Sequence, residues 1–268
     1  MEASRPDPDA AATSLLEARG LAKSFRGLQA LVDYELHLTP LTIHGVIGPN
    51  GAGKTTLFHL LSGFLRPSSG SISFEGRDIT GTAAFRVSRM GIGRTFQNIR
   101  LFGELSVLDN VKVALQRQSS TSLIATLFSS PSFRRREREL DVRATELLDL
   151  FGLAGQRDRL ARNLPYGDQR RLEIARAVGT RPKILLLDEP NAGMNPIETQ
   201  ELLGLIRRLR DELGITIVLV AHDIPLVMNL CDRIQVLNYG RLIAEGAPVT
   251  VRENPDVIAA YLGQARHA

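Results

Sequence analysis

Three apolar runs stand out along the chain, at residues 43–47, 184–188 and 215–220. Each is long enough for a strand and almost free of polar residues, which is typical of parallel strands that are buried on both faces of a sheet. An amphipathic helix lies between the last two runs, and its start is marked by Asn195 as N-cap and by Glu198 three residues later. Strands that alternate with a helix in this way predict an α/β core with a parallel sheet.

The remaining elements divide into a β-rich part and a helical part. Residues 15–18 and 31–38 have the composition of strands, and residues 71–76 are typical of a hairpin, so a small antiparallel β subdomain is predicted. Helical spacing takes over between about 105 and 180, in three segments: 107–115, 134–151 and 169–178. We expect this region to be a helical subdomain inserted into the core.

Composition restricts the possible functions. The 268 residues suffice for one large α/β domain, and we expect residues 1–13, rich in Ala, Pro and Asp, to form a flexible tail. The 33 basic and 29 acidic residues give a net charge of +4, which is too mild to indicate nucleic-acid binding. No stretch has the length of about 20 apolar residues that a membrane-spanning helix needs. A single cysteine, Cys231, excludes an intrachain disulfide and fits a reducing cytoplasm, most simply as a small buried residue.

The segment Gly48–Thr56 matches the phosphate-binding pattern G-x-x-x-x-G-K-[ST] directly after the apolar run 43–47. In this pattern backbone N–H groups point at phosphate oxygens, Lys54 reaches the β and γ phosphates, and the Thr55 hydroxyl binds Mg²⁺. The alternative is a glycine-rich turn that carries a lysine by chance, but the chain has only four lysines and one falls on the required position. ATP and Mg²⁺ are therefore the expected ligands. The loop residues expected to bind nucleotide are Asn50, Gly51, Ala52, Gly53, Lys54, Thr55 and Thr56.

Two adjacent acids end the second apolar run, at the edge where α/β sheets bind their ligands. Asp188 is expected to hold Mg²⁺, and Glu189 to orient and polarise the attacking water. The alternative, a pair of solvated turn residues, is less favoured because the phosphate loop lies upstream. His222 follows the third run, where a side chain could touch the γ-phosphate, although a lone histidine is more often structural.

These residues together resemble the ATP-binding cassette (ABC) ATPase family, over nearly the whole chain from about Leu15 to Gly263. The resemblance implies a P-loop NTPase (RecA-like) fold for residues 14–265. It assigns Phe25 to stacking on adenine, His222 to the switch histidine, and Gln97 to contacts with Mg²⁺, the attacking water and a membrane partner. Residues 164–169 lie where the family has its signature, which completes the ATP site of an opposing subunit. The signature residues expected to contact nucleotide are Tyr166, Gly167, Asp168 and Gln169. The catalytic set is then Lys54, Gln97, Glu189 and His222, with Thr55, Gln97 and Asp188 around the metal.

The sequence departs from the family pattern at two positions, one in the signature and one in the loop at the interface between the two ATPase subunits. Pro165 replaces the signature serine and supplies neither a hydroxyl nor an N–H, so the N–H groups of Tyr166 and Gly167 must carry more of that contact. Asn195 replaces an aspartate and removes a charge. Neither change touches the residues assigned to hydrolysis, so ATP hydrolysis remains the expectation.

Finer resemblance points to the ATP-binding subunit of bacterial branched-chain amino acid importers, carried by residues 166–176, 192–196, 131–135 and the tail 254–263. It implies a peripheral subunit on the cytoplasmic face of the cell membrane. The implied partners are integral-membrane permeases, a second ABC ATPase chain in a heterodimer or homodimer, and indirectly a periplasmic or lipid-anchored substrate-binding protein. Urea importers and lipopolysaccharide-type exporters share parts of the pattern, and a non-catalytic, non-transport ABC adaptor is a further alternative because of Pro165.

Overall fold

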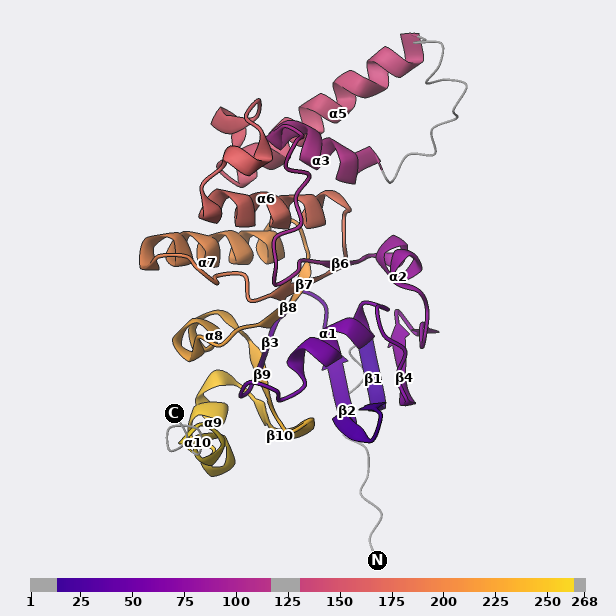
Figure 1. Cartoon of the computed structure of the whole chain (residues 1–268), viewed down its shortest axis with the longest axis vertical. Coiled ribbons are helices and arrows are strands. Elements are labelled where there is room, and N and C mark those ends of the chain that lie inside the picture. The colour runs from indigo at the N-terminus through magenta and orange to yellow at the C-terminus, as the bar shows by residue number, and fades with distance from the viewer. Residues whose placement is uncertain (1–13, 117–130, 263–268) are drawn as a thin grey trace, which may run out of the picture. The chain divides into compact units, whose positions relative to one another are not determined.

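The computed structural model describes residues 14–116 and 131–262 (Figure 1). The tail expected at residues 1–13 lies outside the described residues. The chain divides into two compact units, one formed by residues 1–87 and 216–268 and the other by residues 88–215. The domain 14–265 and the helical subdomain at about 105–180 stay predictions of the sequence.

The first unit contains an antiparallel sheet in the order β2-β1-β4-β5. Its strands are β1 (Leu16–Phe25), β2 (Leu28–Leu38), β4 (Ser69–Phe74) and β5 (Arg77–Asp78). In the second half of β2, Tyr34, Leu36 and Leu38 are buried and alternate with exposed residues, which is the period expected of a sheet with one covered face. The predicted antiparallel subdomain and its hairpin are therefore present. β1 continues to Phe25, beyond the predicted end at Ala18, because its more exposed half still pairs with both neighbouring strands.

The same unit carries the parallel strands. β3 (Ile43–Ile47) pairs in parallel with β8 (Thr216–Val220) and with β9 (Arg233–Asn238), and β10 (Arg241–Gly246) adds an antiparallel edge. Every residue of β3 and β8 is buried, which explains why both read as unbroken apolar runs. The helices of this unit are α1 (Lys54–Leu61), α8 (Ile224–Leu230), α9 (Pro248–Arg252) and α10 (Pro255–Leu262), while α2 (Ala84–Met90) crosses the boundary between the units.

The second unit contains the parallel pair β6 (Ile92–Arg94) and β7 (Ile184–Asp188) and a group of helices. The helices are α3 (Val107–Gln116), α5 (Pro131–Leu150), α6 (Tyr166–Gly179) and α7 (Pro196–Asp211), with short 3-10 turns at Ala154–Gln156 and Ala161–Asn163. α3, α5 and α6 pack against one another, as Figure 1 shows. α6 begins at Tyr166, ahead of the predicted start at Gln169, with Pro165 as its N-cap. A proline is tolerated at this position because the first N–H groups of a helix have no partner within the helix.

The N-terminus of α7 confirms its predicted cap. The Asn195 side chain accepts a hydrogen bond from the Glu198 N–H, and the Glu198 carboxylate accepts one from the Asn195 N–H, both at 2.9 Å. Cys231 is buried, as expected of a small core residue. Within residues 14–116 and 131–262, no helix combines the length and the apolar composition needed to cross a bilayer.

Candidate active site

The loop between β3 and α1 depends on its glycines. Gly48, Gly51 and Gly53 all have positive φ, at 151°, 77° and 106°. A Cβ on Gly48 would lie 2.1 Å from the carbonyl oxygen of Leu237, and one on Gly53 would lie 2.5 Å from that of Ala30. Any side chain at these two positions would collide with backbone, so the loop can follow this path only with glycine there.

Lys54 lies inside this loop. Its side chain is buried, and Nζ donates hydrogen bonds to the carbonyl oxygens of Gly48 and Pro49, at 2.7 and 2.8 Å. The loop therefore curls around the ammonium group and brings a positive charge to its own centre. Such a curl is the shape that a triphosphate requires.

The start of α1 fits an anion. Lys54 is its first residue, no side chain caps it, and its first turn has no acidic residue. The N–H groups and the positive end of the helix dipole are thus directed at the loop without a competing carboxylate. Thr55 is exposed and Thr56 is half-buried in this first turn, and Asn50 is exposed in the loop. These features fit a bound phosphate group and leave the Thr55 hydroxyl available to a cation beside it.

Two other predicted residues of the same unit lie at strand ends. Phe25 is the last residue of β1, with 41% of its surface exposed and the Lys23 ammonium 5.1 Å from its ring centre. His222 is exposed just after β8, next to Asp223, which caps α8 by accepting from the Leu226 N–H at 3.0 Å. An exposed aromatic face on Phe25 is what stacking on a base requires.

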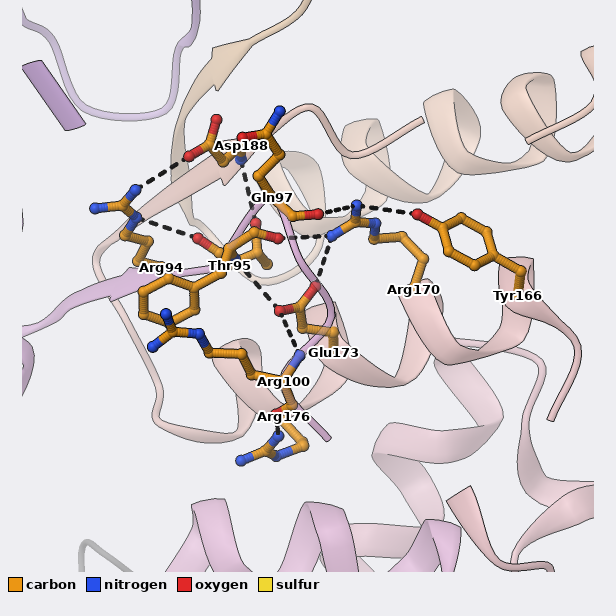
Figure 2. A network of polar contacts seen from close by, with 10 residues as sticks. Arg94, Thr95, Gln97, Arg100, Tyr166, Arg170, Glu173, Arg176 and Asp188 are labelled. Carbon is orange, nitrogen blue, oxygen red and sulfur yellow. Dashed lines mark hydrogen bonds and ion pairs between the residues drawn. The ribbon is translucent and has the colours of Figure 1, made fainter. Parts of the chain in front are cut away.

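In the second unit, Asp188 ends β7 and forms an ion pair that the sequence did not reveal. Its Oδ2 lies 3.0 Å from Nη2 of Arg94 at the end of β6, and both side chains are at least 95% buried. The Asp188 N–H also donates to the Thr95 hydroxyl at 3.2 Å. Burial lowers the pKa of Arg94, while the Asp188 carboxylate beside it raises that pKa and keeps the guanidinium charged. Asp188 is therefore held in one place, with a cation as neighbour (Figure 2).

Glu189 and Gln97 are brought together in this unit. The Gln97 Nε2 lies 3.5 Å from Oε2 of Glu189, at the limit of hydrogen-bond length. Glu189 has a φ of 48°, a left-handed conformation that is costly for a residue with a side chain. Strain of this kind is concentrated at functional sites, where it sets the direction of a side chain.

The signature segment forms the first turn of α6. Tyr166 is 46% exposed, and α6 has no side-chain cap because Pro165 precedes it. The side chains of Asp168 and Gln169 are already engaged: Oδ2 of Asp168 accepts from Gln156 at 2.7 Å, and Nε2 of Gln169 donates to the Leu164 carbonyl at 2.9 Å. A Cβ on Gly167 would lie 2.8 Å from the Glu198 carboxylate, so a side chain at this position would require that carboxylate to move.

Sequence reasoning also missed Arg170 and Glu173 on α6. Arg170 is fully buried, and its Nη1 lies 2.8 Å from the Glu173 carboxylate. Figure 2 shows this pair in contact with the segment that contains Gln97. A signal existed in the sequence, because two opposite charges three residues apart fall on the buried face of a helix, where charges need partners.

The predicted site residues thus divide between the units. The phosphate loop, Phe25 and His222 belong to the first, and Gln97, Asp188, Glu189 and the signature segment to the second. The described part of the chain has no group of three His, Cys, Asp or Glu side chains placed to hold a metal by themselves. Mg²⁺ beside a nucleotide does not need such a group, since it takes most of its ligands from phosphate and water.

Two family profiles match the chain. The profile described as "ABC transporter" covers residues 31–192, and one described as "Branched-chain amino acid ATP-binding cassette transporter" covers residues 241–267. The first includes the phosphate loop, the signature segment and Glu189. The second covers β10 and the C-terminal helices.

Individual proteins match over almost the full length. The chain is 49% identical to the high-affinity branched-chain amino acid transport ATP-binding protein LivG of Escherichia coli (strain K12), over 94% of this chain and 98% of that protein. It is 47% identical to the corresponding protein BraF of Pseudomonas aeruginosa, with the same coverage. Among solved structures, the ADP conformation of an ATP-binding cassette of an ABC transporter matches with a TM-score of 0.80 and 30% identity, over 93% of this chain and 99% of that one. The expected P-loop NTPase fold is confirmed.

Proposed function

Because this chain belongs to the ABC transporter ATP-binding family and is an ATPase subunit of a membrane transporter, we propose that it drives the import of branched-chain amino acids. Two similarities support this substrate class. In the named relatives nearly half of the residues are identical to those of this chain, along almost its whole length. The second family profile also matches the C-terminal region. The observation that carries the proposal is this full-length similarity to transport subunits for one class of substrate.

The phosphate loop is the proposed binding site for the triphosphate of ATP. Lys54 would exchange its bonds to the Gly48 and Pro49 carbonyls for bonds to the β and γ phosphates. The uncapped N–H groups at the start of α1 would bind phosphate oxygens, and the exposed face of Phe25 would stack on the adenine.

Thr55, Gln97 and Asp188 are the proposed protein contacts of Mg²⁺. The ion, when bound, supplies positive charge that neutralises the charge developing on the transferred phosphoryl group. Arg94 already orients the Asp188 carboxylate for this role, and the Thr95 hydroxyl fixes the backbone of Asp188 by accepting from its N–H. Arg94 thereby holds one carboxylate oxygen of Asp188 and directs how the group faces the metal.

Glu189 is the proposed general base, with Gln97 as the residue that positions the attacking water. Their side chains lie 3.5 Å apart, and each has oxygen or nitrogen atoms that can share one water molecule between them. His222 is proposed to donate to the γ-phosphate from the end of β8. The left-handed backbone at Glu189 sets the direction of this carboxylate.

We propose that two ABC chains face each other, because one phosphate loop and one signature segment cannot complete an ATP site within a single chain. Pro165 weakens the signature that this chain offers, which favours a different second ATPase whose signature retains serine. The proposed assembly joins these chains to integral-membrane permeases at the cytoplasmic face of the membrane, with a substrate-binding protein on the other side. A mass measurement of the intact transporter tests this arrangement, since two copies of this chain with no second ATPase would contradict it.

The test of the proposed function is transport by the purified complex. The chain is tagged, its copurifying permeases and ATPase are reconstituted into liposomes, and uptake of radiolabelled leucine and urea is compared with and without ATP. ATP-dependent leucine uptake supports the proposal. Uptake of urea alone reassigns the substrate, and a complex without any ATPase activity would indicate the non-catalytic adaptor.

A further inference from the structure

The backbone that carries Gln97 is held by side chains of α6. Nη1 of Arg170 donates to the Phe96 carbonyl at 2.7 Å, and Nη2 donates to the Gln97 carbonyl at 2.8 Å. The Glu173 carboxylate accepts from two N–H groups of the same segment, those of Phe96 at 3.3 Å and Arg100 at 3.4 Å. Two neighbouring side chains of one helix thus bind four backbone groups between residues 96 and 100 (Figure 2).

A third side chain of α6, that of Arg176, extends this contact. Nη1 of Arg176 donates to the Arg100 carbonyl. All of these bonds go to the backbone, so they do not depend on which side chains the segment carries. The glutamine loop, residues 96–100, is therefore attached to α6 at both of its ends.

The two side chains that contact the loop, Arg170 and Glu173, are charged and lie in the protein interior. Arg170 is fully buried and Glu173 is 95% buried. Burial raises the pKa of Glu173, while Arg170 and the two backbone N–H groups lower it and favour the carboxylate. Within the described residues the Arg170 Nε has no hydrogen-bond partner, so the guanidinium is placed by its two Nη atoms on the loop and on Glu173.

The first turn of the same helix, directly before Arg170, belongs to the signature segment. α6 starts at Tyr166, one turn before Arg170, and the Tyr166 hydroxyl lies 3.5 Å from Arg170 Nη2. Gln97 lies at the opposite side of the arginine, 3.5 Å from Glu189. The signature turn and the general base are thus joined through Arg170 and the backbone of Gln97.

We propose that the Arg170–Glu173 pair is a positioning device for hydrolysis, which fixes Gln97 and transmits the position of the signature turn to it. The pair touches no substrate, so it acts through Gln97 and not as a catalytic residue. This inference rests on the proposed role of Gln97 and Glu189 in ATP hydrolysis. The proposal extends that role, because the position of Gln97 would depend on α6. The first turn of α6 in turn serves the ATP site of the opposing subunit.

Two conservative variants test the proposal. Arg170→Lys keeps the positive charge but replaces the planar guanidinium, whose two Nη atoms reach two carbonyls, by a single ammonium group. Glu173→Gln keeps an acceptor but removes the charge that holds Arg170. Both are expected to lower kcat by about 10- to 100-fold, the scale of a small misplacement of a reacting group, and to leave KM for ATP and the affinity for a fluorescent ATP analogue within about twofold of the wild-type values. Arg208→Lys, which alters an exposed pair with Glu212 on α7, is the matched control and is expected to leave kcat unchanged.

Amide hydrogen exchange separates positioning from general stability. The Phe96 and Arg100 amides of the wild-type chain are expected to be protected although they lie in a loop, and both variants are expected to exchange them faster while α3 and α5 are unaffected. An equal loss of protection throughout the helices, or an unchanged kcat, would overturn the proposal. Unprotected Phe96 and Arg100 amides in the wild type would overturn it even if neither variant folds. If the wild-type complex hydrolyses no ATP, the proposed function fails, and the exchange measurement still decides whether the pair holds the loop.

Discussion

The Tyr34 hydroxyl on β2 donates a hydrogen bond to Oε1 of Gln235 on β9, and both residues are fully buried. Burial raises the pKa of Tyr34 well above its usual value, so the hydroxyl keeps its proton and remains a donor. Nε2 of the same glutamine donates to the Glu35 carbonyl on β2 at 3.0 Å. One glutamine of the parallel strands therefore joins them to the antiparallel sheet of the same unit.

Tyr34→Phe is expected to destabilise the chain by about 1 to 3 kcal/mol, because the buried side-chain oxygen of Gln235 loses its donor. Urea unfolding of the purified chain measures the change. Tyr239→Phe is the control, since Tyr239 is 86% exposed and should change the unfolding midpoint little. Equal midpoints for Tyr34→Phe and the wild type would show that the hydroxyl contributes nothing to stability.

The capping box of α7 leads to a second stability prediction. Asn195→Ala removes the acceptor for the Glu198 N–H and should cost about 1 kcal/mol. Asn195→Asp retains the acceptor and adds the charge that the family pattern usually has there, so it should be at least as stable as the wild type. Thermal unfolding of both variants measures the effect, and a larger loss in the aspartate variant would contradict the cap.

Lys54→Ala is expected to abolish ATP binding, because the phosphates lose a charge that the closed loop shields from water. Equilibrium binding of a fluorescent ATP analogue measures it. Lys183→Ala, at an exposed lysine of the other unit, should bind ATP as the wild type does. Retained affinity in the Lys54 variant would remove the phosphate-loop assignment.

Glu189→Gln is expected to retain ATP binding and to slow hydrolysis by about 10²- to 10⁴-fold, the usual contribution of a positioned general base. The ATP-bound state should then accumulate as a dimer, which size-exclusion chromatography with light scattering detects. Glu253→Gln, at an exposed carboxylate, provides the control. Wild-type turnover in the Glu189 variant would assign the base to another residue.

Phe25→Ala is expected to weaken ATP binding by about 1 to 3 kcal/mol, the usual contribution of a base stacked on an aromatic ring, and to leave kcat unchanged. Inorganic triphosphate, which has no base, should bind the variant and the wild type equally well. Phe85→Ala removes another exposed phenylalanine and should leave both affinities unchanged. A loss of triphosphate affinity in the Phe25 variant would falsify the stacking assignment.

The sequence alone determined the features that are local or periodic. The buried strands β3, β7 and β8, the cap of α7 and the phosphate loop were all predicted, because each depends on neighbouring residues: apolar runs, a capping pair three residues apart, and glycines that permit positive φ. The predicted site residues at strand ends followed from the same local logic, since the carboxyl ends of parallel strands collect at one edge of a sheet.

Only the tertiary structure decided which distant side chains meet. Arg94 and Asp188 are 94 positions apart, Arg170 and the Gln97 carbonyl are 73 apart, and Tyr34 and Gln235 are 201 apart. No periodicity or spacing encodes these pairs. They form because β6 and β7 are paired in register, because α6 packs beside the glutamine loop, and because β2 packs against β10, the neighbour of β9. Long-range contacts of this kind depend on the packing of whole elements, so the charged residues that position the site can be found in the sequence only as buried charges that must have a partner.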